Sequence, residues 1–583
     1  MDNQRNLLLA VALSGLLILG WDMAMRVFYP QASLSGQPDA VATSSEAAPA
    51  AASPAAIGGA GGGGAPVDLD AALASPERVR IDAPRLEGSI NLVGARLDDI
   101  ELKDHRDALG EDSRPVQLFA PQGTSGQYFA EFGFLANGQR LPDDLQWQAS
   151  GTTLTTSTPV TLTHTSEDGL TYSITFSIDD NYMIDAVQSV ENTGTAGAVV
   201  QPFALINRTS ANASPSTFNA HSGPMGAFGD TVEYGPDYDD LAEEGSHTPA
   251  GGAPDWFGFS DIYWLSALVP TDQKDATAGF RSLGNDIYRA DLIYAPQTLA
   301  PGAKISRDTR LFAGAKESVV LGDYERAGIE NFGKAIDWGW FEWFVKPMVW
   351  LLRTLYEFVG NFGVAIILLT VIIRGVMFPI AQKQFASMAA MRAVQPKMKA
   401  LQERYKDDKQ KQQQEVMKLY KDEGINPLAG CLPILIQIPI FFALYKALIL
   451  AIEMRHKPFV LWIQDLSAPD PAKILNLFGL LPFDPPGFLG IGVLAVLLGI
   501  TMWLTFRLNP TAMDPVQQQI FSFMPWILMF VMAPFAAGLL LYWVTSNLLT
   551  LAQQSYLYSK HPQLRAQAEK DKADQALADK RKG

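Results

Sequence analysis

The sequence contains little cysteine and no clustered histidine, and each shortage excludes a class of protein. One cysteine, Cys431, occurs among 583 residues, so an intrachain disulfide is impossible. A large exported domain without disulfides is compatible with a bacterial periplasm. The six histidines are scattered without metal-ligand spacing, and none lies in an apolar run. Since GxSxG, P-loop and zinc motifs are also missing, we expect no catalytic residues, no metal, no cofactor and no enzyme activity.

Positive charge is scarce in the first half of the chain. Residues 29–340 carry 42 acidic and 18 basic residues, a net charge of −24, whereas the remainder carries 19 and 27, a net charge of +8. This asymmetry argues against nucleic acid as the partner of the acidic block, and we expect no sequence-specific nucleic-acid binding. The basic block contains long apolar runs that are typical of membrane spans. A chain of this length is too long for one core, so we expect at least two domains.

The first apolar run, Leu7–Trp21, follows Arg5 and precedes the aromatic residues Phe28 and Tyr29. These features predict an uncleaved signal anchor over residues 1–30, with a cleaved signal peptide as the alternative. Residues 31–66 are rich in Ala, Gly, Pro and Ser, which predicts a flexible linker.

Residues 67–330 have the texture of a β-domain. Polar and apolar residues alternate over 152–165 and 170–178, and a turn at 179–181 precedes another strand over 183–190. Many short strands separated by Gly, Pro, Asn and Asp predict a large β-sandwich. The acidic cluster near residue 240 could be a sugar or cation site, or simply a solvated loop.

Apolar helices are predicted for the rest of the chain. Residues 331–360 crowd tryptophans together with a few charges, as in an amphipathic helix that lies at a membrane interface. Residues 361–380 have the length of a span. Four more spans are predicted within 431–558, at about 431–452, 487–506, 520–534 and 536–557. A single broken span at Pro534 is the alternative for the last two. Together with the N-terminal run, this predicts a polytopic α-helical membrane protein of six spans that carries the β-sandwich outside.

Loop charges predict the orientation. The loop 381–430 carries ten Lys and Arg residues and the tail 559–583 carries seven, whereas the loop 453–487 carries three. The positive-inside rule therefore places both termini in the cytoplasm and the acidic domain outside, in the periplasm. Apolar residues spaced three and four apart predict a helical hairpin over 381–430. Its basic face could dock a ribosome or another protein, or lie solvated near anionic lipid; the candidate contacts are Lys397, Lys399, Arg404 and Lys406.

Arg374 lies within the otherwise uncharged span 361–380. A charge at the centre of a bilayer costs about 2.5–3.5 kcal/mol on insertion scales, so such residues usually serve a function. The alternative is that its side chain reaches the interface near Pro379. The later spans contain one charged residue, Lys446, and no carboxylate. We therefore expect the partner of Arg374 to be an acidic or polar group of a substrate.

Further polar residues interrupt the predicted spans. Thr370 lies one helical turn before Arg374 and shares its face. Gln437 lies in the third span, where it could line a polar groove or simply bond helix to helix. In the last span, Trp543, Ser546 and Asn547 occur at i, i+3 and i+4, which predicts one shared face.

Five stretches in these spans carry a resemblance to a known family. They are IIRGVMFPI (372–380), NPLAGCLPILIQIPIFFALY (426–445), FVLWIQDLSAPDP (459–471), DPVQQQIFSFMP (514–525) and GLLLYWVTSNLL (538–549). In this order they resemble the YidC/Oxa-type membrane protein insertase family over roughly residues 355–558.

The resemblance implies a five-helix core with a hydrophilic groove open to the cytoplasm and to lipid. Arg374 matches the groove arginine that attracts polar parts of a nascent membrane protein, and Thr370 matches a position beside it. Trp543 matches a position near substrate where an aromatic, often Tyr, occurs. The implied function is a membrane protein insertase and chaperone of the bacterial inner membrane. The implied partners are nascent membrane proteins, the Sec translocon with its accessory subunits, the ribosome and the lipid bilayer.

Two interpretations of other classes compete with this one. The first is a small-molecule transporter or channel with a periplasmic sensing domain, although the internal inverted repeats typical of transporters are not seen. The second is an envelope enzyme that uses the β-domain as a carbohydrate-active module.

Overall fold

The computed structural model describes most of residues 66–560. The gaps are residues 76, 111, 215–219, 274, 384–393, 395–396, 399, 402, 406–407, 424–431, 479, 482, 484, 486–489 and 509–514. The predicted signal anchor, nearly all of the linker, and the tail after residue 560 lie outside the described residues.

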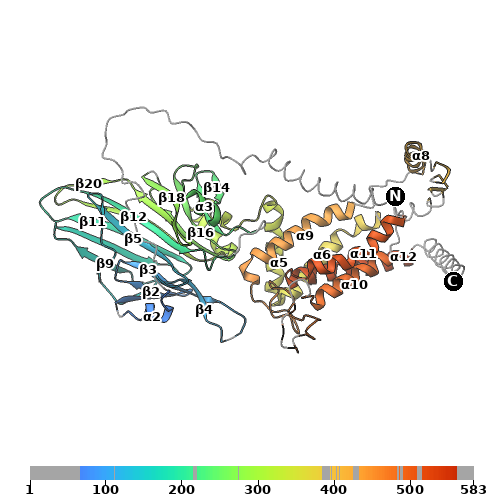
Figure 1. The fold of residues 1–583 in the computed structure, drawn as a ribbon, viewed down its shortest axis with the longest axis horizontal. Helices are drawn as coiled ribbons and strands as arrows, with labels where there is room; N and C mark the ends of the chain where they lie inside the picture. Colours follow the sequence, from blue (N-terminus) through green and yellow to red (C-terminus); the bar gives the residue numbers. More distant parts are fainter. Residues whose placement is uncertain are drawn as a thin grey trace. The chain divides into compact units, whose positions relative to one another are not determined.

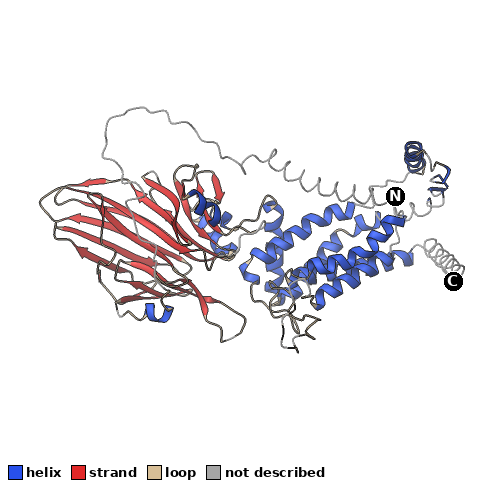
Figure 2. Ribbon diagram, in the orientation of Figure 1, coloured by secondary structure: helices blue, strands red, loops and turns tan. Residues whose placement is uncertain are grey.

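Strands dominate the region before residue 320 and helices dominate the region after it (Figure 2). The strands form one sheet of twelve and one of nine. The first sheet contains β1 (Arg78–Asp82), β2 (Leu86–Asn91), β3 (Arg96–Arg106), β4 (Pro115–Phe119), β5 (Tyr128–Ala136), β6 (Gln139–Arg140), β8 (Thr153–Leu154), β12 (Ala198–Thr209), β15 (Ser246–His247), β18 (Ala276–Gly284), β19 (Ile287–Tyr294) and β20 (Gln297–Leu299). The second contains β7 (Gln148–Ala149), β9 (Val160–Thr165), β10 (Leu170–Ile178), β11 (Met183–Asn192), β13 (Gly223–Phe228), β14 (Thr231–Tyr234), β16 (Pro254–Ser260), β17 (Trp264–Pro270) and β21 (Lys304–Ala315).

The two sheets pack face to face, which confirms the predicted β-sandwich (Figure 1). The rings of Phe132 on β5 and Phe176 on β10 meet edge-on with centroids 5.7 Å apart. The hydroxyls of Tyr128 on β5 and Ser266 on β17 are hydrogen-bonded across the same interior. Aromatic rings thus supply much of the core, and this pair shows how a buried hydroxyl is satisfied there.

Strand β10 shows why the sequence pattern succeeds. Its residues alternate strictly between buried and partly exposed, with Leu, Tyr, Ile and Phe inside and Thr and Ser outside. Alternation of period two places one side of a strand in the core, so β10 matches the predicted range 170–178. The predicted single strand over 152–165 is wrong, because a turn at residues 155–158 divides it into β8 and β9.

Among the described residues, three short helices accompany the strands, and longer helices follow residue 340. The short ones are α2 (Leu69–Leu73), α3 (Tyr238–Glu244) and α4 (Ser318–Arg326), with a 3-10 turn η3 at Phe332–Ala335. The longer ones are α5 (Glu342–Val359), α6 (Phe362–Val376), α9 (Leu432–Leu450), α10 (Val493–Leu508), α11 (Pro515–Met532) and α12 (Ala537–Lys560). A further helix, α8 (Lys409–Asp422), and a 3-10 turn, η5 (Ile452–Met454), complete the described elements. The acidic cluster near residue 240 therefore forms a helix, α3, rather than a loop.

The helix α12 is central to the helical region (Figure 1). It packs against α6, α9 and α10, while α5 packs against α6 and α9. Helices α11 and α12 are separate, with Pro534 between them. None of the helices in the described ranges is both long enough and apolar enough to cross a membrane.

The helix α5 is two-sided. Val345, Met348 and Leu352 are buried, whereas Trp343 and Trp350 are 71% and 67% exposed. A row of exposed tryptophans opposite a buried apolar row is typical of a helix at a membrane interface. Trp338, in the segment before α5, differs from these tryptophans because it is buried.

Candidate functional site

The helix α6 carries the arginine that interrupts an apolar segment. Its first turn is capped by Asn361, whose side-chain oxygen accepts a hydrogen bond of 3.1 Å from the Val364 amide. Such a cap satisfies one of the free amides at a helix start. Arg374 lies in the last turn, where a positive charge interacts favourably with the helix dipole.

The guanidinium of Arg374 is directed at α12. Its Nε and Nη2 atoms donate to Oγ of Ser546 over 3.1 and 2.5 Å. The Gln553 amide, further along α12, donates to the Arg374 carbonyl over 3.3 Å. Ser546 is buried, so the arginine contacts the helical interior through a neutral hydroxyl. These contacts hold the arginine against α12 rather than along its own helix.

The charge of Arg374 is not neutralised by a carboxylate within the described part of the chain. Lys446 on α9 provides a contrast. Its ammonium lies 3.5 Å from the Asp337 carboxylate and donates to the Asp337 carbonyl over 3.0 Å. Lys446 is buried beside a carboxylate, whereas Arg374 is partly buried and has no carboxylate partner among the described residues. A charge that is withdrawn from water without a counter-ion is costly. Arg374 is the one of the two that can take an acidic partner from elsewhere.

Polar side chains near Arg374 extend to a third helix. The Gln437 amide on α9 donates to the Tyr542 hydroxyl on α12. That hydroxyl also lies within interaction range of Ser546 and Arg374. Polar contacts therefore connect α9, α12 and α6 in sequence. Gln437 bonds helix to helix, and through Tyr542 it also belongs to the surroundings of the arginine.

The other predicted site residues point to different neighbours. The hydroxyl of Thr370 donates to the Ile366 carbonyl of its own helix over 2.6 Å and is fully buried. Asn547 donates to Thr501 on α10 over 3.1 Å. Trp543 meets the ring of Phe441 on α9, with centroids 5.0 Å apart.

The predicted shared face of Trp543, Ser546 and Asn547 is thus divided among three helices. Adjacent residues on a helix differ by about 100° in direction. At the centre of a bundle this angle suffices to direct Ser546 to α6 and Asn547 to α10.

Three contributors were not predicted as site residues: Tyr542, Thr501 and Gln553. Tyr542 precedes Ser546 by four residues, so helical spacing could have predicted that the two share the face of α12 that contacts Arg374. Thr501 and Gln553 gave no such signal, because their partners lie on other helices.

The hairpin region 381–430 is described in part. The Tyr420 hydroxyl on α8 bonds to the sulfur of Met398, which brings the two arms of the hairpin together. Lys397 forms an ion pair of 2.5 Å with Glu423 and is thereby occupied within the hairpin. Arg404 is exposed. Lys399 and Lys406 lie outside the described residues.

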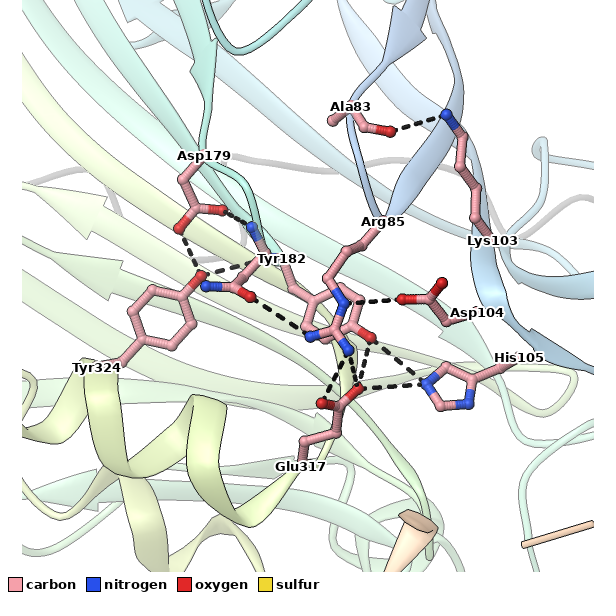
Figure 3. Close-up of polar contacts among 10 residues, drawn as sticks. Ala83, Arg85, Lys103, Asp104, His105, Asp179, Tyr182, Glu317 and Tyr324 are labelled. Carbon is pink, nitrogen blue, oxygen red and sulfur yellow. Dashed lines mark hydrogen bonds and ion pairs between the residues drawn. The ribbon is translucent and has the colours of Figure 1, made fainter. Parts of the chain in front are cut away.

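A dense polar cluster of the β-domain surrounds Glu317 (Figure 3). The Glu317 carboxylate accepts from Arg85 over 2.7 and 2.9 Å and from the Tyr182 hydroxyl over 2.8 Å, and a His105 ring nitrogen lies 3.4 Å away. Asp104 accepts from the same guanidinium over 2.9 Å.

Burial opposes ionisation of Glu317, but hydrogen bonds from His105, Arg85 and Tyr182 outweigh it and lower its pKa to about 2. A carboxylate so fully engaged is a poor proton acceptor at neutral pH. The cluster therefore joins β3 to the start of α4 and stabilises the fold, rather than supplying an acid–base pair. Over the described ranges, no group of three or more His, Cys, Asp and Glu side chains could hold a metal ion.

Comparison with known proteins identifies the family. Residues 354–564 match the family described as 60Kd inner membrane protein, and residues 78–351 match the family described as YidC periplasmic domain. The membrane protein insertase YidC of Zymomonas mobilis is 44% identical over 570 residues, which cover 96% of each chain. The YidC of Beijerinckia indica is 42% identical, again over 96% of each chain.

A solved structure of an active YidC insertase with its first transmembrane domain resolved aligns with 82% of this chain and 92% of its own. Its identity is 19% and its TM-score 0.35, too low to establish a shared arrangement. The sequence relatives suffice. Their identity and coverage, together with the two family matches, decide between the insertase and transporter interpretations, and the chain belongs to the YidC family of inner-membrane protein insertases.

Proposed function

We propose that the protein inserts nascent membrane proteins by attracting their acidic or polar translocated segments to Arg374, and that it then helps them to fold in the lipid. One observation carries the proposal. A partly buried arginine of α6 is hydrogen-bonded to a neutral serine of α12, and it has no carboxylate partner among the described residues. Such a charge attracts an acidic segment over a longer distance in a low-dielectric setting than it would in water.

The energetic role of the site is to lower the cost of moving polar groups through the membrane. An unpaired polar group in hydrocarbon costs several kcal/mol. A groove lined by Arg374, Gln437, Tyr542 and Ser546 would replace part of the lost hydration. The membrane potential, which is positive outside, favours outward movement of each acidic charge by about 2.3 kcal/mol per 100 mV. The groove lowers the barrier to crossing, and the potential drives an acidic segment outward.

In the proposed topology, six spans place both termini in the cytoplasm and the β-sandwich in the periplasm. The support is the distribution of Lys and Arg, with ten in the loop 381–430 against three in the loop 453–487. The exposed tryptophans of α5 would lie at the periplasmic interface. In this topology the hairpin 381–430 faces the cytoplasm.

The proposed partners follow from the insertase function and from charge. Nascent membrane proteins are the substrates, taken either directly or from the Sec translocon and its accessory subunits. The hairpin contributes Arg404, and by sequence Lys399 and Lys406, as contacts for the ribosome or for anionic lipid. Lys397 contributes less, because Glu423 already pairs with it.

The test is complementation in a bacterium whose own insertase is depleted. The reporter is a short membrane protein whose translocated segment is either acidic or neutralised by Asn and Gln substitution, and the readout is protease accessibility of that segment. We expect Arg374→Ala to reduce insertion of the acidic reporter strongly and of the neutral reporter weakly.

Arg374→Lys is the matched control. It keeps the positive charge but loses the planar fork that bonds carboxylates in pairs, so we expect insertion of the acidic reporter between the levels of wild type and alanine. Equal losses for both reporters in the alanine variant would refute the role of the arginine while leaving the insertase function intact.

A further inference from the structure

The segment joining α9 to α10 exposes an unusual apolar surface. In the stretch 473–483, every described residue with an exposed side chain is a large apolar one. These are Ile474, Leu475, Leu477, Phe478, Leu480, Leu481 and Phe483. Asn476 is buried and Lys473 is partly exposed. We name the described residues within 473–483, which exclude 479 and 482, the apolar loop. Exposed apolar patches of this kind mark an interaction surface.

The base of the apolar loop is fixed to the helices. The carboxylate of Asp470 accepts from the Leu494 amide in the first turn of α10 over 2.8 Å and from the Ala472 amide over 3.0 Å. It also accepts from the indole of Trp462 over 2.9 Å. A β-bridge pairs Lys473 with Gly492. The loop is therefore held at the N-terminal end of α10.

The backbone of the apolar loop is bonded largely to itself and to its base. The amides of Ile474 and Phe478 donate to the carbonyls of Ile491 and Lys473 over 3.0 and 2.9 Å. The amide of Leu481 donates to the Asn476 carbonyl over 3.0 Å. The amides of Leu477, Leu480 and Phe483 also donate within the loop. This arrangement suits an apolar environment, where an unpaired amide is expensive. In water, the same amides could donate to solvent instead of to other groups of the loop.

Two of the exposed residues adopt a conformation that bulky residues rarely accept. Leu477 has φ of 51° and Phe478 has φ of 63°. Left-handed backbone is unusual for large side chains and is strained. The turn nevertheless presents both side chains outward, 52% and 60% exposed.

A second row of exposed apolar side chains lies on α10. Leu497, Ile500 and Leu504 recur at spacings of three and four along α10, and all are exposed. In an inner-membrane protein, a row of this kind faces lipid. The apolar loop precedes this row in the chain, at the N-terminal end of the helix.

We propose that the apolar loop is a lipid anchor. It inserts Leu477, Phe478 and Leu480 into the headgroup–acyl boundary of the bilayer at the N-terminal end of α10. The occupant is lipid rather than protein because no exposed described side chain of the loop carries a charge or a hydrogen-bonding group. Protein interfaces, in contrast, usually have a polar rim. The identity of the leaflet, the outer one, rests on the proposed topology.

The experiment uses the full-length protein in lipid nanodiscs, with Cys431→Ser as the background that removes the single native cysteine. An environment-sensitive fluorophore is attached at Leu477→Cys or at Leu480→Cys. The matched control is Ser157→Cys, an exposed position in the turn before β9. Nitroxide-labelled phospholipids quench from the bilayer, and iodide quenches from water.

We expect both loop labels to lose most of their fluorescence with nitroxide lipid and little with iodide, and the Ser157 label to show the reverse. Loop labels quenched like the Ser157 label would overturn the inference. So would loop labels protected from both quenchers, because that result indicates burial against protein. The measurement requires no insertion activity, so its failure and a failure of the Arg374 mechanism can be told apart.

Discussion

Replacing Ser546 with aspartate would give Arg374 a permanent counter-ion without removing the arginine. In the structure, Ser546 Oγ lies 2.5 Å from Arg374 Nη2, so the new carboxylate would stand beside the guanidinium. If the arginine acts by attracting acidic segments, an internal carboxylate should compete with them. We therefore expect Ser546→Asp to impair insertion of acidic segments although Arg374 itself is unchanged.

The magnitude follows from the distance. Two unit charges about 4 Å apart attract by about 4 kcal/mol at an effective dielectric constant of about 20. Desolvation of the new carboxylate offsets part of this. If half of this attraction remains, about 2 kcal/mol opposes the binding of an incoming acidic group. That group then binds about thirty-fold more weakly, because each tenfold change in affinity corresponds to about 1.4 kcal/mol. Insertion of an acidic reporter should then fall to the level of Arg374→Ala.

The assay is the complementation experiment with paired acidic and neutral reporters. Ser546→Asn is the matched control, since it adds an amide of similar shape without charge and should support insertion of both reporters. Normal insertion of the neutral reporter by Ser546→Asp would show that the variant is folded. The reasoning would be refuted if Ser546→Asp inserted the acidic reporter as well as wild type while Arg374→Ala did not. The substrate would then need the arginine for a reason other than its unneutralised charge.

Two further predictions concern stability. Gly363→Ala should destabilise the helical region by about 1–3 kcal/mol, because the new Cβ would lie 2.0 Å from a ring carbon of Phe459. Gly375→Ala, in the same helix with no atom within 4 Å, should instead be neutral or stabilising, and thermal unfolding in detergent measures both. The lowered pKa of Glu317 stabilises the fold above pH 4.5, and this contribution, on the order of 2–3 kcal/mol, is lost as pH falls from about 4.5 to 2. Glu317→Gln should flatten that part of the acid unfolding curve, and an unchanged slope would contradict the assignment.

Local patterns predicted the strands whose signal is contained in a few neighbouring residues. The alternation in β10 fixed both its boundaries and the face that it buries. The break after β8 was missed because residues 155–158 turn without a glycine or a proline inside the turn. The order of strands in the two sheets depends on pairings between distant segments, such as β12 with β5 and β19, which periodicity cannot reveal.

The candidate site was predictable to the extent that it consists of polar residues in apolar runs. Arg374, Gln437 and Ser546 were conspicuous for that reason, and the structure joins them through Tyr542. The pairing of Asn547 with Thr501 was not predictable, because it depends on how α10 packs against α12. The apolar loop escaped notice in the sequence because its run is too short to resemble a span.

The most direct test of the central claim is a cross-link between the groove and a nascent chain. A photoreactive phenylalanine replaces Trp543, which is half-buried against Phe441 beside the Arg374 contact. Ribosome-bound chains of defined length carry either an acidic or a neutral translocated segment. We predict an adduct with the acidic segment that falls when Arg374 is changed to alanine and when the acidic residues are neutralised. Equal adducts in all of these cases would contradict the proposal that Arg374 recruits the substrate.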